Sequence, residues 1–164
     1  MLLNLKLPAI KKFILLLLLI PFISFSQNLT FIGENSYPST IEFEFENKEK
    51  DLFITFLKDN ENILIMLKTE DAVDFLKPTI DGKMIIYLDS GKVISSIAPS
   101  YKDYVDEFCI SIYPIAKSDI TDIILGEINS IRYAIVDKFE KIKNRVASKK
   151  ANSPISKSLL DLIE

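Results

Sequence analysis

Residues 40–68 contain three apolar runs separated by short polar turns, and this pattern constrains the fold more than any other feature of the chain. In residues 40–46, Ile41, Phe43 and Phe45 alternate with three glutamates, which predicts a strand with one buried and one solvent-exposed face. The runs at 51–58 and 63–68 follow after turns of four residues, and the first of these runs is apolar on both faces. The pattern therefore predicts an antiparallel meander with a buried central strand.

The next part of the chain mixes helix and strand signals. We expect a short helix capped by Thr69, a hairpin over 83–97, a loop over 99–106, a strand over 107–113 that ends at Pro114, and a helix capped by Ser118 or Asp119. Residues 128–136 fit either a strand or a continuation of that helix. We prefer the strand, because β-branched residues dominate and Gly126 interrupts the helical pattern.

The last 28 residues, 137–164, predict a basic amphipathic helical segment. Phe139, Ile142 and Val146 recur at helical spacing among basic side chains, and a second short helix follows Pro154. Strands followed by helices indicate an α+β domain. The predicted fold is one α+β domain over 27–164, in which two or three helices pack on one face of an antiparallel sheet of about six or seven strands.

Residues 1–26 have the form of a secretory signal peptide. Lysines precede an apolar run at 13–23, and small residues at the −3 and −1 positions predict cleavage between Ser26 and Gln27. An uncleaved membrane anchor is the alternative, but the run is about half of the roughly 20 residues that a spanning helix needs. Cleavage would leave 17 basic and 23 acidic residues, a net charge of −6, with no transmembrane segment.

The composition excludes several kinds of chemistry. The chain has no His and one Cys, so His-dependent acid–base catalysis, His-ligated metals and paired-cysteine zinc sites are excluded. We expect no cofactor, and the acidic balance predicts no nucleic-acid partner. The single cysteine, Cys109, is expected to be a buried thiol.

Two acidic groups are candidate sites. Glu42, Glu44 and Glu46 share one strand face and could supply oxygen ligands to Ca²⁺, although a solvated face that protects an edge strand explains them more simply. Another group could supply the two carboxylates of a glycoside hydrolase, and its alternative interpretation is a solvated loop. This second group consists of Asp103, Asp106 and Glu107.

The basic segment is the third candidate, as a surface for anionic lipid or an acidic partner. Its cations are Lys138, Lys141, Lys143, Arg145, Lys149 and Lys150. We expect an exported, periplasmic or extracellular, non-catalytic binding protein whose partner is an envelope protein, a glycan or an anionic surface. The alternatives are a His-free hydrolase that uses the carboxylates and a peripheral membrane protein attached through residues 138–150.

Overall fold

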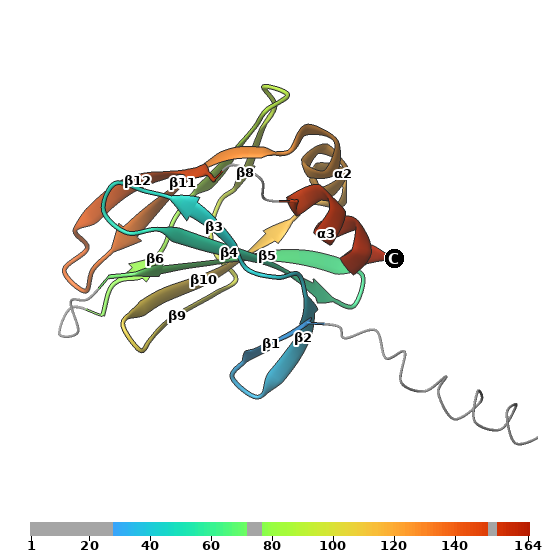
Figure 1. The fold of residues 1–164 in the computed structure, drawn as a ribbon. Helices are drawn as coiled ribbons and strands as arrows, with labels where there is room; N and C mark the ends of the chain where they lie inside the picture. The colour runs from blue at the N-terminus through green and yellow to red at the C-terminus, as the bar shows by residue number, and fades with distance from the viewer. Residues whose placement is uncertain (1–27, 72–76, 151–153) are drawn as a thin grey trace, which may run out of the picture.

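The computed structural model describes residues 28–71, 77–150 and 154–164, and its described part is dominated by one antiparallel sheet (Figure 1). The strands are β1 (Asn28–Ile32), β2 (Asn35–Ser39), β3 (Phe43–Glu46), β4 (Leu52–Asp59), β5 (Asn62–Glu70), β6 (Thr79–Ile80), β7 (Met84–Leu88), β8 (Val93–Ser96), β9 (Tyr101–Val105), β10 (Phe108–Ile115), β11 (Ile128–Val136) and β12 (Ile142–Lys149). The helices in this part are α2 (Lys117–Gly126) and α3 (Ile155–Ile163).

The predicted fold class is wrong. Twelve strands form a single sheet in the order β8-β7-β11-β12-β3-β4-β5-β10-β9, and the sheet curls into a half-barrel instead of lying flat under helices. The β1–β2 hairpin joins through β2 and β4, and β6 pairs with β11. Strands twist relative to their neighbours, so a sheet of this many strands curls around its own apolar face. The two short helices, α2 and α3, cover one end of the curled sheet.

The central meander is confirmed. Phe43 and Phe45 are buried while the glutamates between and after them reach solvent, as the alternation predicted, but Ile41 is exposed because β3 begins only at Phe43. β4 is buried on both faces, because Leu52, Ile54 and Phe56 face the main core and Leu57 faces the β1–β2 hairpin. The strand over Ile128–Val136 and the hairpin of β7 and β8 are also confirmed.

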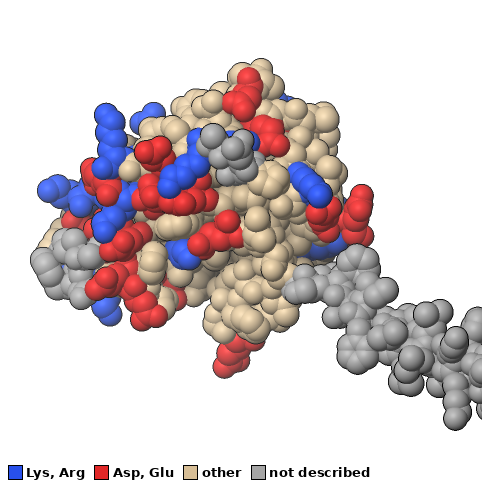
Figure 2. Space-filling view, viewed as in Figure 1, with Lys and Arg blue, Asp and Glu red and all other residues tan. Residues whose placement is uncertain are grey.

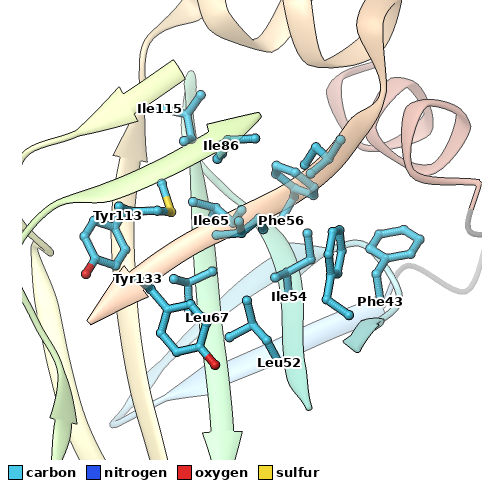
Figure 3. Packing of buried hydrophobic residues seen from close by; sticks show 14 of the residues in the cluster. Phe43, Leu52, Ile54, Phe56, Ile65, Leu67, Ile86, Tyr113, Ile115 and Tyr133 are labelled. Carbon is cyan, nitrogen blue, oxygen red and sulfur yellow. The ribbon is translucent and has the colours of Figure 1, made fainter. Parts of the chain in front are cut away.

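The inner face of the sheet encloses the main core. Side chains from β3, β4, β5, β7, β10 and β11 meet there, and Figure 3 shows Phe56, Ile65 and Tyr113 converging from different strands. Both helices add to this core at one end of the curl, through residues such as Ile123 and Leu159. Across the core, the hydroxyls of β10 donate to backbone carbonyls, Ser111 to Ile80 and Tyr113 to Gly82, and these bonds tie the two sides of the curl together.

A second, smaller core lies on the outer face of β4, β5 and β10. The β1–β2 hairpin covers Leu57, Met66 and Ile112 there with Ile32 and Tyr37. β1 and β2 pair over residues 28–39 to form this hairpin. The signal peptide and its Ser26–Gln27 cleavage site lie outside the described residues.

Several local expectations differ from the structure or fall outside its described part. Thr69 lies buried in β5, where its hydroxyl donates to the Asp51 carbonyl at 2.9 Å, and the short helix expected after it falls on residues 72–76, outside the described part. Most of the loop expected at 99–106 is β9, paired with β10. Pro114 lies within β10 instead of ending it, beyond the last residue that pairs with β9. α2 begins at Lys117, and no side chain caps it.

The predicted helix over 137–150 is wrong, because this segment contains β12. Phe139, Ile142 and Val146 are spaced as on a helix, but Ile142, Asn144 and Val146 all lie on the exposed outer side of the strand. The opposite side carries the buried Arg145 and Ala147. The final helix is confirmed as α3, with Ile155 and Leu159 buried.

Candidate functional site

The cations of the predicted basic segment do not form one surface, because three lie on the inward side of β12 and Lys138, Lys141 and Lys150 lie before or after the strand. Lys143, Arg145 and Lys149 share the inward side with Ala147, and each pairs with a carboxylate. Lys150 contacts Glu44 and Asp51, and Lys138 lies 5.2 Å from the ring of Phe139. Figure 2 shows basic and acidic side chains interleaved at the end of the molecule where β12 and β3 lie. The residues at 138–150 therefore do not provide the helix on which the lipid hypothesis depended.

Arg145 is the buried member of this group. Its Nη2 lies 3.3 Å from Oδ2 of the buried Asp71 and 2.7 Å from Oε2 of the exposed Glu49. Its Nε and Nη1 atoms, and the hydroxyl of the neighbouring Tyr133, are buried without a hydrogen-bond partner in the described part of the chain. A buried ion pair of this kind fixes the position of β12 against the end of β5.

Cys109 lies buried near the same ion pair and is chemically protected. Burial raises the pKa of its thiol most, and the negative charge of Asp71 raises it further, so that the pKa is about 12. Nucleophilic cysteines need the opposite shift, toward a stable thiolate. The expected burial of this thiol is confirmed.

The candidate hydrolase carboxylates lie on a hairpin and its turn. Asp106 and Glu107 are the two turn residues between β9 and β10, both with positive φ (49° and 69°) and both exposed. Asp103, on β9, accepts a hydrogen bond from the Tyr101 hydroxyl at 2.8 Å, and this bond raises the pKa of the tyrosine. General acid catalysis requires a carboxyl group in an apolar pocket, and the turn gives Asp106 and Glu107 no such burial.

The glutamates near β3 are engaged with lysines. Glu42 pairs with Lys68 and Glu44 with Lys150, while Glu46 is exposed. Among residues 28–71, 77–150 and 154–164, no group of three or more carboxylate or thiol side chains is arranged to hold a metal ion. Glu42 and Glu44 therefore each form a surface ion pair with a lysine.

The most distinctive surface is a groove on the outer side of β7, β11 and β12, which we call the outer groove. It has a volume of about 550 Å³. Its lining consists of Asp81, Gly82, Lys83, Ile85, Arg132, Ala134, Val136, Ile142 and Asn144. Pairing across the three strands places Arg132 beside Ile85 and Val146 at one end, and Val136 beside Ile142 at the other. Ala134 lies between them along β11, so the small side chain creates the depression.

The charges of the outer groove are predominantly positive. No described carboxylate lies within ion-pair distance of Arg132 or Lys83, whereas Asp81 is paired with Lys102. Apolar side chains are exposed in and beside the groove: Ile142, which lines it, is 63% exposed, and Val146, the partner of Arg132 on β12, is 52% exposed. Exposed apolar side chains beside cations without a described acidic partner make the outer groove a candidate interaction surface.

Part of this groove had a signal in the sequence. Arg132, Ala134 and Val136 alternate with buried residues in a strand that the pattern predicted. The other wall, Ile142 and Asn144, was predicted to be helical, so the pairing of these two segments was not expected.

Comparison with known proteins provides no relative: no family model, curated protein or solved structure matches this chain. Neither helix of the described part is long and apolar enough to cross a membrane. What the chain does must therefore be inferred from its own side chains.

Proposed function

We propose that the chain is an exported, non-catalytic binding protein of the cell envelope or extracellular space, and that the outer groove is its binding surface. The observation that carries this proposal is the combination of an exposed apolar floor with an arginine that has no carboxylate partner among the described residues. Arginine and aromatic residues surrounded by apolar side chains are the groups that dominate binding energy at interfaces. Arg132 is a group of this kind, with Ile85 and Val146 as its partners on the neighbouring strands.

The state of the reactive groups supports a non-catalytic role. The thiol of Cys109 is buried with its pKa raised to about 12, and Asp106 and Glu107 lie exposed on a turn. The chain has no histidine to serve as a general base at neutral pH. Binding requires none of these groups, and the outer groove contains none of them.

The proposal is tested by expressing the tagged full-length sequence in a diderm bacterial host and following both its location and its retention on isolated envelopes. We expect a product that begins at Gln27 and is recovered outside the cytoplasm. Ile142→Glu should reduce envelope retention about tenfold or more, since a charge on the groove wall opposes apolar contact. Leu125→Glu is the matched control, because Leu125 is an exposed apolar residue on α2, away from the groove.

Three results would overturn the proposal. One is a full-length product found in the cytoplasm. Another is equal envelope retention of the two variants. The third is hydrolysis of an envelope glycan or peptide that disappears when Asp103 or Asp106 is replaced.

A further inference from the structure

The outer groove combines two cations that have no acidic partner among the described residues with apolar side chains, and this combination indicates what kind of ligand it binds. Arg132 and Val136 are four residues apart on β11, or about 13 Å at a strand's rise per residue. Ala134 lies between them, flanked by Asn144 on β12 and by Asp81, whose amide donates to the Ala134 carbonyl at 3.0 Å. A ligand that matches these side chains has one negative group and one apolar chain.

The arginine favours a carboxylate for the negative group. A guanidinium binds a carboxylate through two parallel hydrogen bonds, and Arg132 is exposed with no acidic partner among the described side chains. Lys83 lines the same groove and adds a second positive charge. The acid within the groove, Asp81, is occupied by Lys102.

The floor disfavours a peptide as the apolar part. β11 pairs with β12 on one side and with β6 and β7 on the other, so the floor of the groove offers no free strand edge. The amides of a peptide laid over Ala134 and Val136 would lose water without gaining backbone partners, and this loss is unfavourable. An aliphatic chain has no such groups to desolvate, and its burial is favourable in proportion to its area.

We infer that the outer groove binds a free aliphatic carboxylate, with its carboxylate on Arg132 and its chain over Ala134 toward Val136 and Ile142. This inference rests on the proposed role of the groove as the binding surface and specifies its ligand class. The volume of about 550 Å³ lies within the range of small-molecule sites.

The test uses protein purified from cells expressing the full sequence, with methyl groups labelled for NMR. Decanoate is titrated below its micelle concentration, and decanol and decyltrimethylammonium are titrated in parallel. We expect decanoate to shift the methyl signals of Ile85, Val136 and Ile142 and to bind about tenfold or more tightly than decanol, because only the carboxylate gains charge-assisted hydrogen bonds. Decyltrimethylammonium should bind more weakly than decanol.

Two variants and a control locate the site. Arg132→Gln should reduce decanoate binding to the level of decanol, and Ala134→Leu should weaken both by filling the depression. Lys117→Gln removes a cation from α2, outside the groove, and should leave the preference unchanged. Unchanged amide spectra outside the groove verify that each variant is folded.

Equal binding of decanoate and decanol, or decanoate shifts away from the groove, would overturn the inference. If decanoate does not bind but Ile142→Glu still loses envelope retention, the ligand class is wrong and the proposed function stands. If decanoate binds through Arg132 but both envelope variants are retained equally, the inference stands and the proposed function is wrong.

Discussion

Arg145 and Asp71 are a buried ion pair, and each has one further partner that is more exposed, Glu49 for Arg145 and Lys143 for Asp71. Replacing one member of a buried pair leaves an uncompensated charge, which is unfavourable by about 3–5 kcal/mol. Arg145→Met should therefore lower the free energy of unfolding by about that amount, and adding Asp71→Asn should recover part of the loss. Urea denaturation at neutral pH measures both changes.

Arg132→Met is the matched control for this prediction. Arg132 occupies the same sheet but is exposed, so its replacement should change the free energy of unfolding by about 0.5 kcal/mol or less. Equal losses for the two arginine variants would show that burial of Arg145 does not determine its contribution.

The raised pKa of the Cys109 thiol predicts a loss of stability at alkaline pH. Its thiol has a pKa of about 12 in the folded chain, raised from an ordinary value near 9 mainly by burial. Because the folded state keeps a proton that the unfolded state releases, this contribution is fully present below about pH 9 and is lost as pH rises toward 12. The urea midpoint should therefore fall above pH 9.

The variant that tests this dependence is Cys109→Ala, in which the fall with pH should be shallower. Tyr113 and Tyr133 also have a raised pKa because they are buried, so part of the fall should remain. Identical pH dependence of the variant and the parent chain would contradict the assignment to the thiol.

At the level of elements, hydrogen bonds of Glu127 connect α3 to β12. Its carboxylate accepts a hydrogen bond from Lys149 of β12 at 2.7 Å and another from the Ser156 hydroxyl in the first turn of α3. Burial alone would raise the pKa of Glu127, but these hydrogen bonds outweigh it and the net pKa is lowered. The stabilisation is therefore present near neutral pH and is lost as pH falls through the folded pKa.

Glu127→Gln should lower the free energy of unfolding by about 1–3 kcal/mol at pH 7. The difference from the parent chain should be smaller at pH 3 than at pH 7, because protonation of Glu127 increases as pH falls toward its lowered pKa. Glu34→Gln, on the turn between β1 and β2, should have little effect at either pH. A Glu127→Gln deficit that is the same at pH 7 and pH 3 would rule out the charged interaction.

The β9–β10 turn predicts a gain in stability. Asp106 and Glu107 both have positive φ, a conformation that disfavours most side chains and that two-residue hairpins usually fill with Asn-Gly. Replacing the pair by Asn-Gly should raise the free energy of unfolding by about 1 kcal/mol. Glu61→Gly, in the turn between β4 and β5, should give no gain, since Glu61 does not have positive φ.

The elements differ in how far their sequence could predict them. β3, β4 and β5 were predictable because their inward positions are apolar, such as Phe43 and Phe45. β12 was not, because its inward positions include Lys143, Arg145 and Lys149, and their carboxylate partners lie far away in the sequence. The outer groove depends on the same non-local pairing of β11 with β12, so only its β11 residues could be anticipated.

On the scale of the whole molecule, one short junction connects two groups of strands. β12 meets β3 through two residue pairs, Ser148 with Glu46 and Lys149 with Phe45. The Asn47 side chain adds a hydrogen bond to the Val146 carbonyl at 2.9 Å. The paired residues are about 100 positions apart, so forming this junction closes most of the chain into a loop.

A disulfide across this junction should stabilise the whole fold. Ser148→Cys with Glu46→Cys joins two exposed, directly paired positions, and closing a loop of about 100 residues should contribute about 2–4 kcal/mol over the reduced form. Val136→Cys with Ile142→Cys joins an equally well-paired position within the β11–β12 hairpin, but its loop is short and its gain should be smaller. Urea denaturation of each pair, oxidised and reduced, measures the two gains in a Cys109→Ala background. Equal increases in the free energy of unfolding from the two disulfides would contradict a fold held together by this distant pairing.

The same disulfides should differ in their effect on the refolding rate. The β3–β12 pairing joins residues that are far apart in the sequence, and closing such a long loop slows folding. The junction disulfide should therefore speed refolding, whereas the hairpin disulfide should not.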